Sequence, residues 1–119
     1  MSEQRAAAKR EIVTGAVERA RVMVVVIGPT WLNTLDHRGN PRLADADDLH
    51  RVEIRTALER QIPIVPVLVG GVKMPRRDEL PPDIQLLSQM LAVEFTDQRW
   101  DYDAQRLSDT IARLLYESR

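Results

Sequence analysis

Glu53 is the ionisable residue whose position in the sequence most suggests chemistry. Residues 47–60 have the spacing of an amphipathic helix, and Glu53 falls on its apolar stripe, in line with Leu49 and Ala57. His50 lies three residues before Glu53 on the same side. A carboxylate among apolar side chains is costly unless it has a partner or a task. Glu53 is therefore the candidate catalytic residue, and His50 is a candidate binding residue beside it.

Both residues also have purely structural interpretations. Glu53 could accept a hydrogen bond from a backbone donor near the helix start, or pair with an arginine from a loop. His50 could cap or pack at the helix start, and only His37 could join it as a metal ligand, so no metal site is predicted. Asp45, Asp47 and Asp48 cluster at the start of this helix, where they suit the positive end of its dipole; a divalent-cation site is the alternative interpretation.

Trp31 lies in a long loop, residues 29–46, where a ligand could bind. The loop follows VMVVVI at 22–27, a run rich in β-branched residues that predicts a strand covered on both faces, as in parallel sheets. Ligands of open α/β sheets bind beyond the carboxyl ends of the strands. Trp31 is therefore a candidate substrate-binding residue, with a core tryptophan as the alternative.

The chain alternates between helical and strand periodicity. Helices are predicted over about 3–20, 47–60, 82–89 and 101–118, and strands at 22–27, 62–69 and 91–95. Such alternation implies right-handed crossovers and a parallel sheet. Pro66 removes a ladder donor in the middle of the second strand, which favours an edge position or a bulge. We expect one α/β domain over residues 1–119, with about three strands and four helices.

Composition excludes several classes of function. The 17 basic and 18 acidic residues are interspersed, so no broad basic surface is available and nucleic acid is not an expected partner. The sequence has no cysteine, which excludes thiol chemistry and thiolate metal sites. The longest apolar run, at 22–27, is far shorter than the roughly 20 residues of a membrane helix. We expect a cytoplasmic domain that does not contact a membrane.

Four segments carry a resemblance to a known family. They are VVVIGPTWL at 24–32, DDLHRVEIRTALERQIPIVPVLV at 47–69, MPRRDELPPDI at 74–84 and AVEFTDQRWDYDAQRLSDTI at 92–111. From about Glu3 onward the chain resembles a bacterial Toll/interleukin-1 receptor (TIR) domain, most specifically over Val52–Val69. The resemblance implies a flavodoxin-like parallel sheet, which in the family has the strand order 2-1-3-4-5.

The resemblance also implies an activity. Many TIR domains hydrolyse NAD to nicotinamide and ADP-ribose products, using a glutamate in a segment EI-x-x-AL, and Glu53 in EIRTAL matches that glutamate. The implied protein is a bacterial signalling or defence protein of the NAD glycohydrolase lineage, with NAD as substrate and no metal or other cofactor. The family's aromatic residue four positions before the glutamate is Leu49 here. With Trp31 and His50, Leu49 completes the predicted substrate-binding set.

Several family elements have no counterpart before Glu3: the first strand, the first helix, the second strand and the BB loop. In the family these elements wall the nucleotide pocket, so we expect an N-terminally truncated, partial domain whose VMVVVI strand has one unpaired edge. An unpaired apolar edge favours self-association, and TIR domains also associate with one another. A non-catalytic protein interaction module is therefore the alternative function. A further interpretation is that coding sequence upstream of Met1 restores the missing elements.

Overall fold

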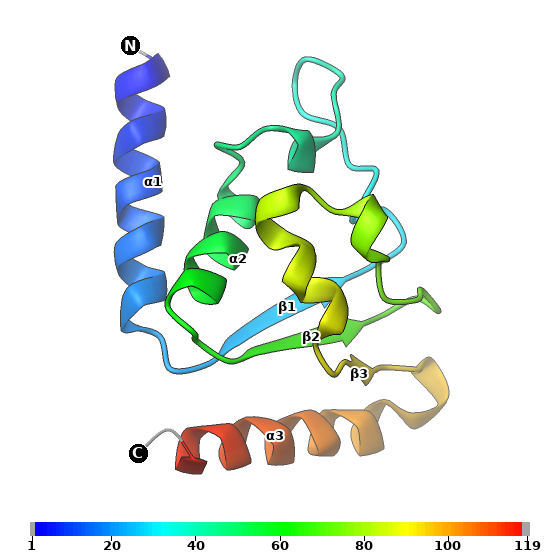
Figure 1. Ribbon diagram of the computed structural model, residues 1–119. Coiled ribbons are helices and arrows are strands. Elements are labelled where there is room, and N and C mark those ends of the chain that lie inside the picture. The colour runs from blue at the N-terminus through cyan, green and yellow to red at the C-terminus, as the bar shows by residue number, and fades with distance from the viewer. Residues whose placement is uncertain (1, 118–119) are drawn as a thin grey trace.

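The computed structural model describes the backbone of residues 2–117 and the side chains of residues 11–117 (Figure 1). Its helices and strands are α1 (Ser2–Arg19), β1 (Met23–Ile27), α2 (Leu49–Glu59), β2 (Ile64–Leu68), β3 (Val93–Glu94) and α3 (Trp100–Glu117). Its 3-10 helices are η1 (Arg42–Ala44), η2 (Arg77–Glu79), η3 (Pro82–Gln89) and η4 (Asp97–Arg99). The strands form one parallel sheet in the order β1-β2-β3. The predicted α/β fold with three parallel strands and four helices is confirmed, with η3 as the third helix along the chain.

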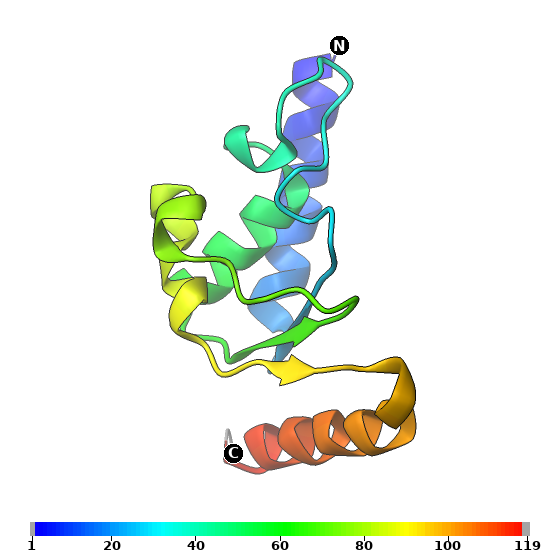
Figure 2. The same ribbon diagram turned by 90° about the vertical axis from the view of Figure 1, so that its right-hand side faces the viewer.

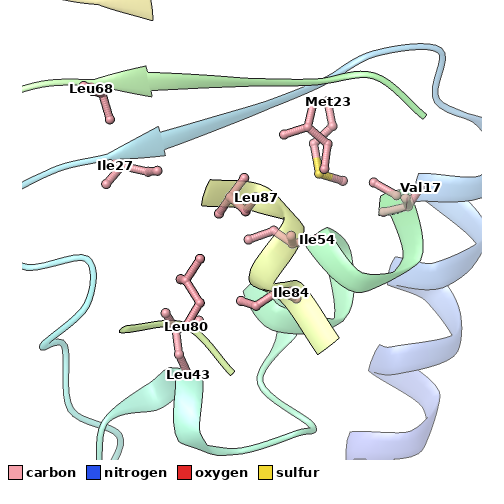
Figure 3. Close-up of a cluster of buried hydrophobic side chains, with 11 residues drawn as sticks. Val17, Met23, Ile27, Leu43, Ile54, Leu68, Leu80, Ile84 and Leu87 are labelled. Carbon is pink, nitrogen blue, oxygen red and sulfur yellow. The ribbon is translucent and has the colours of Figure 1, made fainter. Parts of the chain in front are cut away.

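Helices pack on both sides of the sheet. Figures 1 and 2 show α1, α2 and η3 on one side and α3 on the other. On the α2 side, Ile54, Ile84 and Leu87 come together beneath Ile27 and Met23 of β1 (Figure 3). On the other side, α3 packs on a second cluster, formed by Val65, Val67, Val93 and Phe95. No helix within residues 2–117 is both long enough and apolar enough to cross a membrane.

β2 is the central strand, although Pro66 favoured an edge position or a bulge. The backbone N–H of Val69 donates to the carbonyl of Ile27 over 3.0 Å, so odd-numbered residues of β2 bond toward β1 and even-numbered residues toward β3. Pro66 therefore lacks a donor only on the β3 side. Pairing with β3 begins one residue later, at Val67 with Val93. A central strand tolerates this proline because its missing N–H falls before the ladder starts.

The expectation that both faces of β1 are covered is wrong for one face. Met23 and Ile27 are buried against the helices, but Val24 and Val26 point to the other face and are 40% and 58% exposed. The helix on that face, α3, packs on residues of β2 and β3. It follows β3 after the short helix η4, and it packs on that half of the sheet. Among the residues that the structure describes, β1 pairs only with β2, so its other edge is unpaired.

The start of α2 is fixed by a capping aspartate. Asp48 is the N-cap, and its carboxylate accepts the backbone N–H of Arg51 over 3.1 Å. The other carboxylate oxygen of Asp48 accepts from Arg42 Nε of η1 at 3.2 Å. A capping side chain of this kind stabilises a helix by about 1 kcal/mol. These bonds join the long loop after β1 to the helix that carries Glu53.

Candidate functional site

A hollow of about 220 Å³ lies along the unpaired side of β1. Its lining comes from β1, the loop after β1 and α2, namely Val24, Val25, Val26, Trp31, His50, Glu53 and Ile54. Residues from both faces of β1 line the hollow, and no residue of β2 does. The hollow is therefore open on the side where a further strand would pair with β1.

The Glu53 carboxylate has no protein partner in the part of the chain with described side chains. Glu53 is half-buried at the wall of the hollow. Within residues 11–117, neither a backbone donor nor an arginine bonds to its carboxylate. The structural interpretation of Glu53, as a capping or ion-paired carboxylate, is therefore not realised. Its oxygens are available to a ligand in the hollow.

The arginines next to Glu53 in sequence are held elsewhere by Asp83 of η3. Arg51 Nε lies 3.0 Å from Asp83 Oδ1, and Arg55 Nη1 lies 3.0 Å from Asp83 Oδ2. Burial raises the pKa of Asp83, but the hydrogen bonds from Arg55 and Arg51 and their positive charges outweigh it, so this pKa lies below its ordinary value. Neither arginine lines the hollow, so neither neutralises Glu53 there. Among residues 11–117, Glu53 and His50 are the titratable residues of its lining.

Trp31 and His50 lie where the sequence predicted binding residues, on the wall that carries Glu53. The backbone N–H of Trp31 donates to the carbonyl of Gly28 over 3.1 Å, which turns the chain directly after β1. The Trp31 side chain is partly buried and packs against the core. Both Trp31 and His50 also line a smaller hollow of about 50 Å³, which contains the Arg42–Asp48 pair. The two side chains thus stand between the two hollows.

Leu49, the remaining predicted binding residue, does not line the hollow. On a helix with 3.6 residues per turn, His50 and Ile54 fall to one side of Glu53 and Leu49 falls to the other. Sequence reasoning missed the contribution of β1, whose three valines form one wall. The indication was present in the sequence, because the unpaired edge had been predicted for the same strand.

The comparisons with known proteins add no assignment, since neither a scan against protein-family models nor a search of curated proteins found a match. Within the residues described, no three histidine, aspartate or glutamate side chains gather in a way that could hold a metal ion. As far as the side chains are described, the candidate site consists of one unpartnered carboxylate, an indole, an imidazole and an apolar wall.

Proposed function

We propose that this chain is a TIR-like domain of a signalling or defence protein, and that its hollow beside β1 binds the nicotinamide end of NAD and supports cleavage of the glycosidic bond. The observation that carries this proposal is the Glu53 carboxylate, which lines the hollow and has no partner among the side chains that the structure describes. The nicotinamide ring of NAD is a cation, and an unpaired carboxylate in a partly desolvated hollow is the group that attracts one.

The hollow has room for only part of the NAD molecule. Small-molecule sites usually have volumes of about 300–1,000 Å³, and this hollow measures about 220 Å³. It would take the nicotinamide and its ribose, with the diphosphate and adenosine outside it. Trp31 provides a flat apolar surface against which the nicotinamide ring can stack.

The proposed reaction breaks the bond between ribose C1′ and the nicotinamide nitrogen. The bonding electrons move to the ring, which leaves as neutral nicotinamide, and the positive charge passes to the ribose as an oxocarbenium ion. Glu53 stabilises this charge as it develops, as carboxylates do in glycoside hydrolysis. Water then adds to C1′ and releases a proton, which gives ADP-ribose.

NAD consumption by the purified chain at high protein concentration tests this proposal. Glu53→Gln keeps the shape of the side chain and removes its charge, and Glu59→Gln is the matched control, since Glu59 is exposed at the end of the same helix. We expect the parent and Glu59→Gln to consume NAD, and Glu53→Gln to be slower by about 10²–10³-fold, the usual cost of losing one electrostatic contact to a transition state. A folded parent that leaves NAD intact, or a Glu53→Gln variant as fast as the parent, would overturn it.

A further inference from the structure

The unpaired edge of β1 presents backbone groups that can bond to another strand. In the ladder with β2, Met23, Val25 and Ile27 direct their N–H and C=O groups toward β2. Val24 and Val26 direct theirs the opposite way, where the residues described place no partner strand. Two donors and two acceptors therefore point outward from the middle of β1.

This edge lacks the features with which proteins usually block strand addition. Edge strands are normally protected by a charged residue, a proline, a bulge or a covering element. Residues 22–27 contain no charged residue and no proline, and β1 pairs with β2 in an unbroken register. The exposed side chains of Val24 and Val26 flank the outward backbone groups. An extended peptide can add to such an edge through main-chain hydrogen bonds.

The hollow would receive a side chain of the added strand. Alternate side chains of a strand point to the same face, and the hollow lies along β1 on the α2 side. Its acidic group is Glu53 and Trp31 contributes an aromatic ring, and among residues 11–117 neither a lysine nor an arginine lines it. The complementary side chain is therefore basic, because lysine and arginine bind both carboxylates and aromatic faces.

A second copy of the chain fits this edge less well than an extended peptide. Stable protein pairs bury at least about 1,200 Å², whereas the exposed apolar side chains of β1 are two valines. Self-pairing through β1 would also leave the hollow without a basic side chain, since the VMVVVI run contains none. A peptide strand gains its affinity from main-chain bonds and its specificity from side-chain pockets.

We propose that the edge of β1 and the Glu53 hollow together form a binding site for an extended peptide segment, which pairs with β1 and places a lysine or arginine side chain beside Glu53. The inference goes beyond the proposed NAD chemistry and does not depend on it. Peptide binding and NAD consumption are separate measurements, so either proposal can fail alone.

The probe is a short blocked peptide with a central arginine, valines two positions to either side and threonines between them. Its affinity is measured by fluorescence anisotropy for the parent, for Glu53→Gln and for the matched control Glu59→Gln. We expect binding by the parent and the control, and a loss of about tenfold or more for Glu53→Gln, since one charge-assisted contact corresponds to about that factor. An otherwise identical peptide with a central glutamate is expected not to bind.

Two variants at Val26 test pairing with the edge. Val26→Pro removes an N–H that points outward and leaves the bonds to β2 in place, as edge strands tolerate. Val26→Lys places a charge on an exposed position of the edge. Both variants are expected to melt cooperatively and to lose peptide binding.

Three results would overturn the proposal. One is peptide binding that persists in both Val26 variants while their melts stay cooperative. Another is equal binding of the arginine and glutamate peptides, or no binding of either to a folded parent. The third is concentration-dependent self-association of the parent by light scattering that Val26→Lys abolishes, which would assign the edge to a second copy.

Discussion

Asp83 and Arg51 join η3 to α2 through a contact of 3.0 Å between Asp83 Oδ1 and Arg51 Nε. Arg51 also donates from Nη1 to the carbonyl of Leu43 over 3.0 Å. One guanidinium therefore ties α2 to η3 and to η1, the short helix near the end of the loop that carries Trp31. The orientation of α2, and with it that of Glu53, depends on this contact.

Asp83→Asn is expected to lower the free energy of unfolding at pH 7. It is also expected to make that free energy depend less on pH in the acid range. The folded-state pKa of Asp83 lies below its ordinary value, so folding is favoured while the carboxylate is ionised. This contribution is complete above the ordinary aspartate pKa of about 3.9 and is lost as the pH falls through the folded-state pKa. Replacing the carboxylate leaves two partly buried arginines short of an acceptor, at a cost of about 1–3 kcal/mol.

Urea unfolding of the parent and of Asp83→Asn from pH 7 down to pH 2 measures both effects. The gap between the two free energies of unfolding is expected to narrow below about pH 4. A gap that stays constant over the whole range would show that the ionised form of Asp83 contributes nothing specific.

Asp103→Ala is expected to cost about 1–3 kcal/mol, because it leaves a backbone donor without an acceptor. Asp103 is fully buried, and its Oδ2 accepts the backbone N–H of Thr96 over 2.9 Å. Asp103→Asn keeps an oxygen acceptor and is expected to lose less. Denaturant unfolding ranks the three proteins, and equal stability of the alanine and asparagine variants would contradict the role of this hydrogen bond.

The elements of this fold could be predicted from sequence because their periodicities are local. The β-branched run at 22–27 predicts β1, and the apolar spacing of residues 47–60 predicts α2. Both predicted ranges agree with the ends of these elements to within about two residues. Local periodicity could not predict that one face of β1 stays exposed. The exposure of that face depends on where α3 lies once β3 has joined the sheet. The edge position or bulge predicted from Pro66 was wrong for a similar reason. A missing donor matters only on the side where a partner strand pairs, and that side is a property of the assembled sheet.

The residues of the candidate site that lie on α2 could be predicted from the sequence. Those from the loop after β1 and from β1 itself were harder to predict. Spacing alone placed His50 and Glu53 on one side of α2, and both line the hollow. Leu49 was included because the TIR resemblance places a binding residue four positions before the glutamate, yet Leu49 lies on the side of Glu53 away from His50 and Ile54 and does not line the hollow. The role of Trp31 depended on a general rule about strand ends. The wall formed by Val24, Val25 and Val26 required knowledge of which edge of β1 is open.

Val26→Ala is expected to leave stability almost unchanged, whereas Val67→Ala destabilises the protein. Both valines lie in the sheet, but Val26 is 58% exposed and Val67 is 3% exposed. Truncation of the buried valine removes two methyl groups and leaves a cavity, at a cost of about 2 kcal/mol, and the exposed one should stay within about 0.5 kcal/mol. The midpoints of urea unfolding compare them directly. An equal loss for Val26→Ala would mean that the outer face of β1 is covered in solution.

Gly70→Ala is expected to destabilise the protein more than Gly71→Ala, and to disturb Trp31. Both glycines have positive φ, +71° and +75°, so alanine at either position costs about 1 kcal/mol. A Cβ at Gly70 would also come within 2.9 Å of Pro29 Cγ, whereas a Cβ at Gly71 meets nothing within 4 Å. Pro29 lies two residues before Trp31 in the loop after β1, so the close contact at Gly70 sets the start of that loop.

Tryptophan fluorescence in a Trp100→Phe background separates the two variants, because Trp31 is then the remaining tryptophan. We expect its emission to shift in Gly70→Ala and to stay unchanged in Gly71→Ala. Trp31 lines the hollow with Glu53, so a shift should come with weaker ligand binding there. If the two variants lose the same stability and neither moves the emission, Pro29 yields without cost, and the turn after β2 does not position the loop that forms this wall of the site.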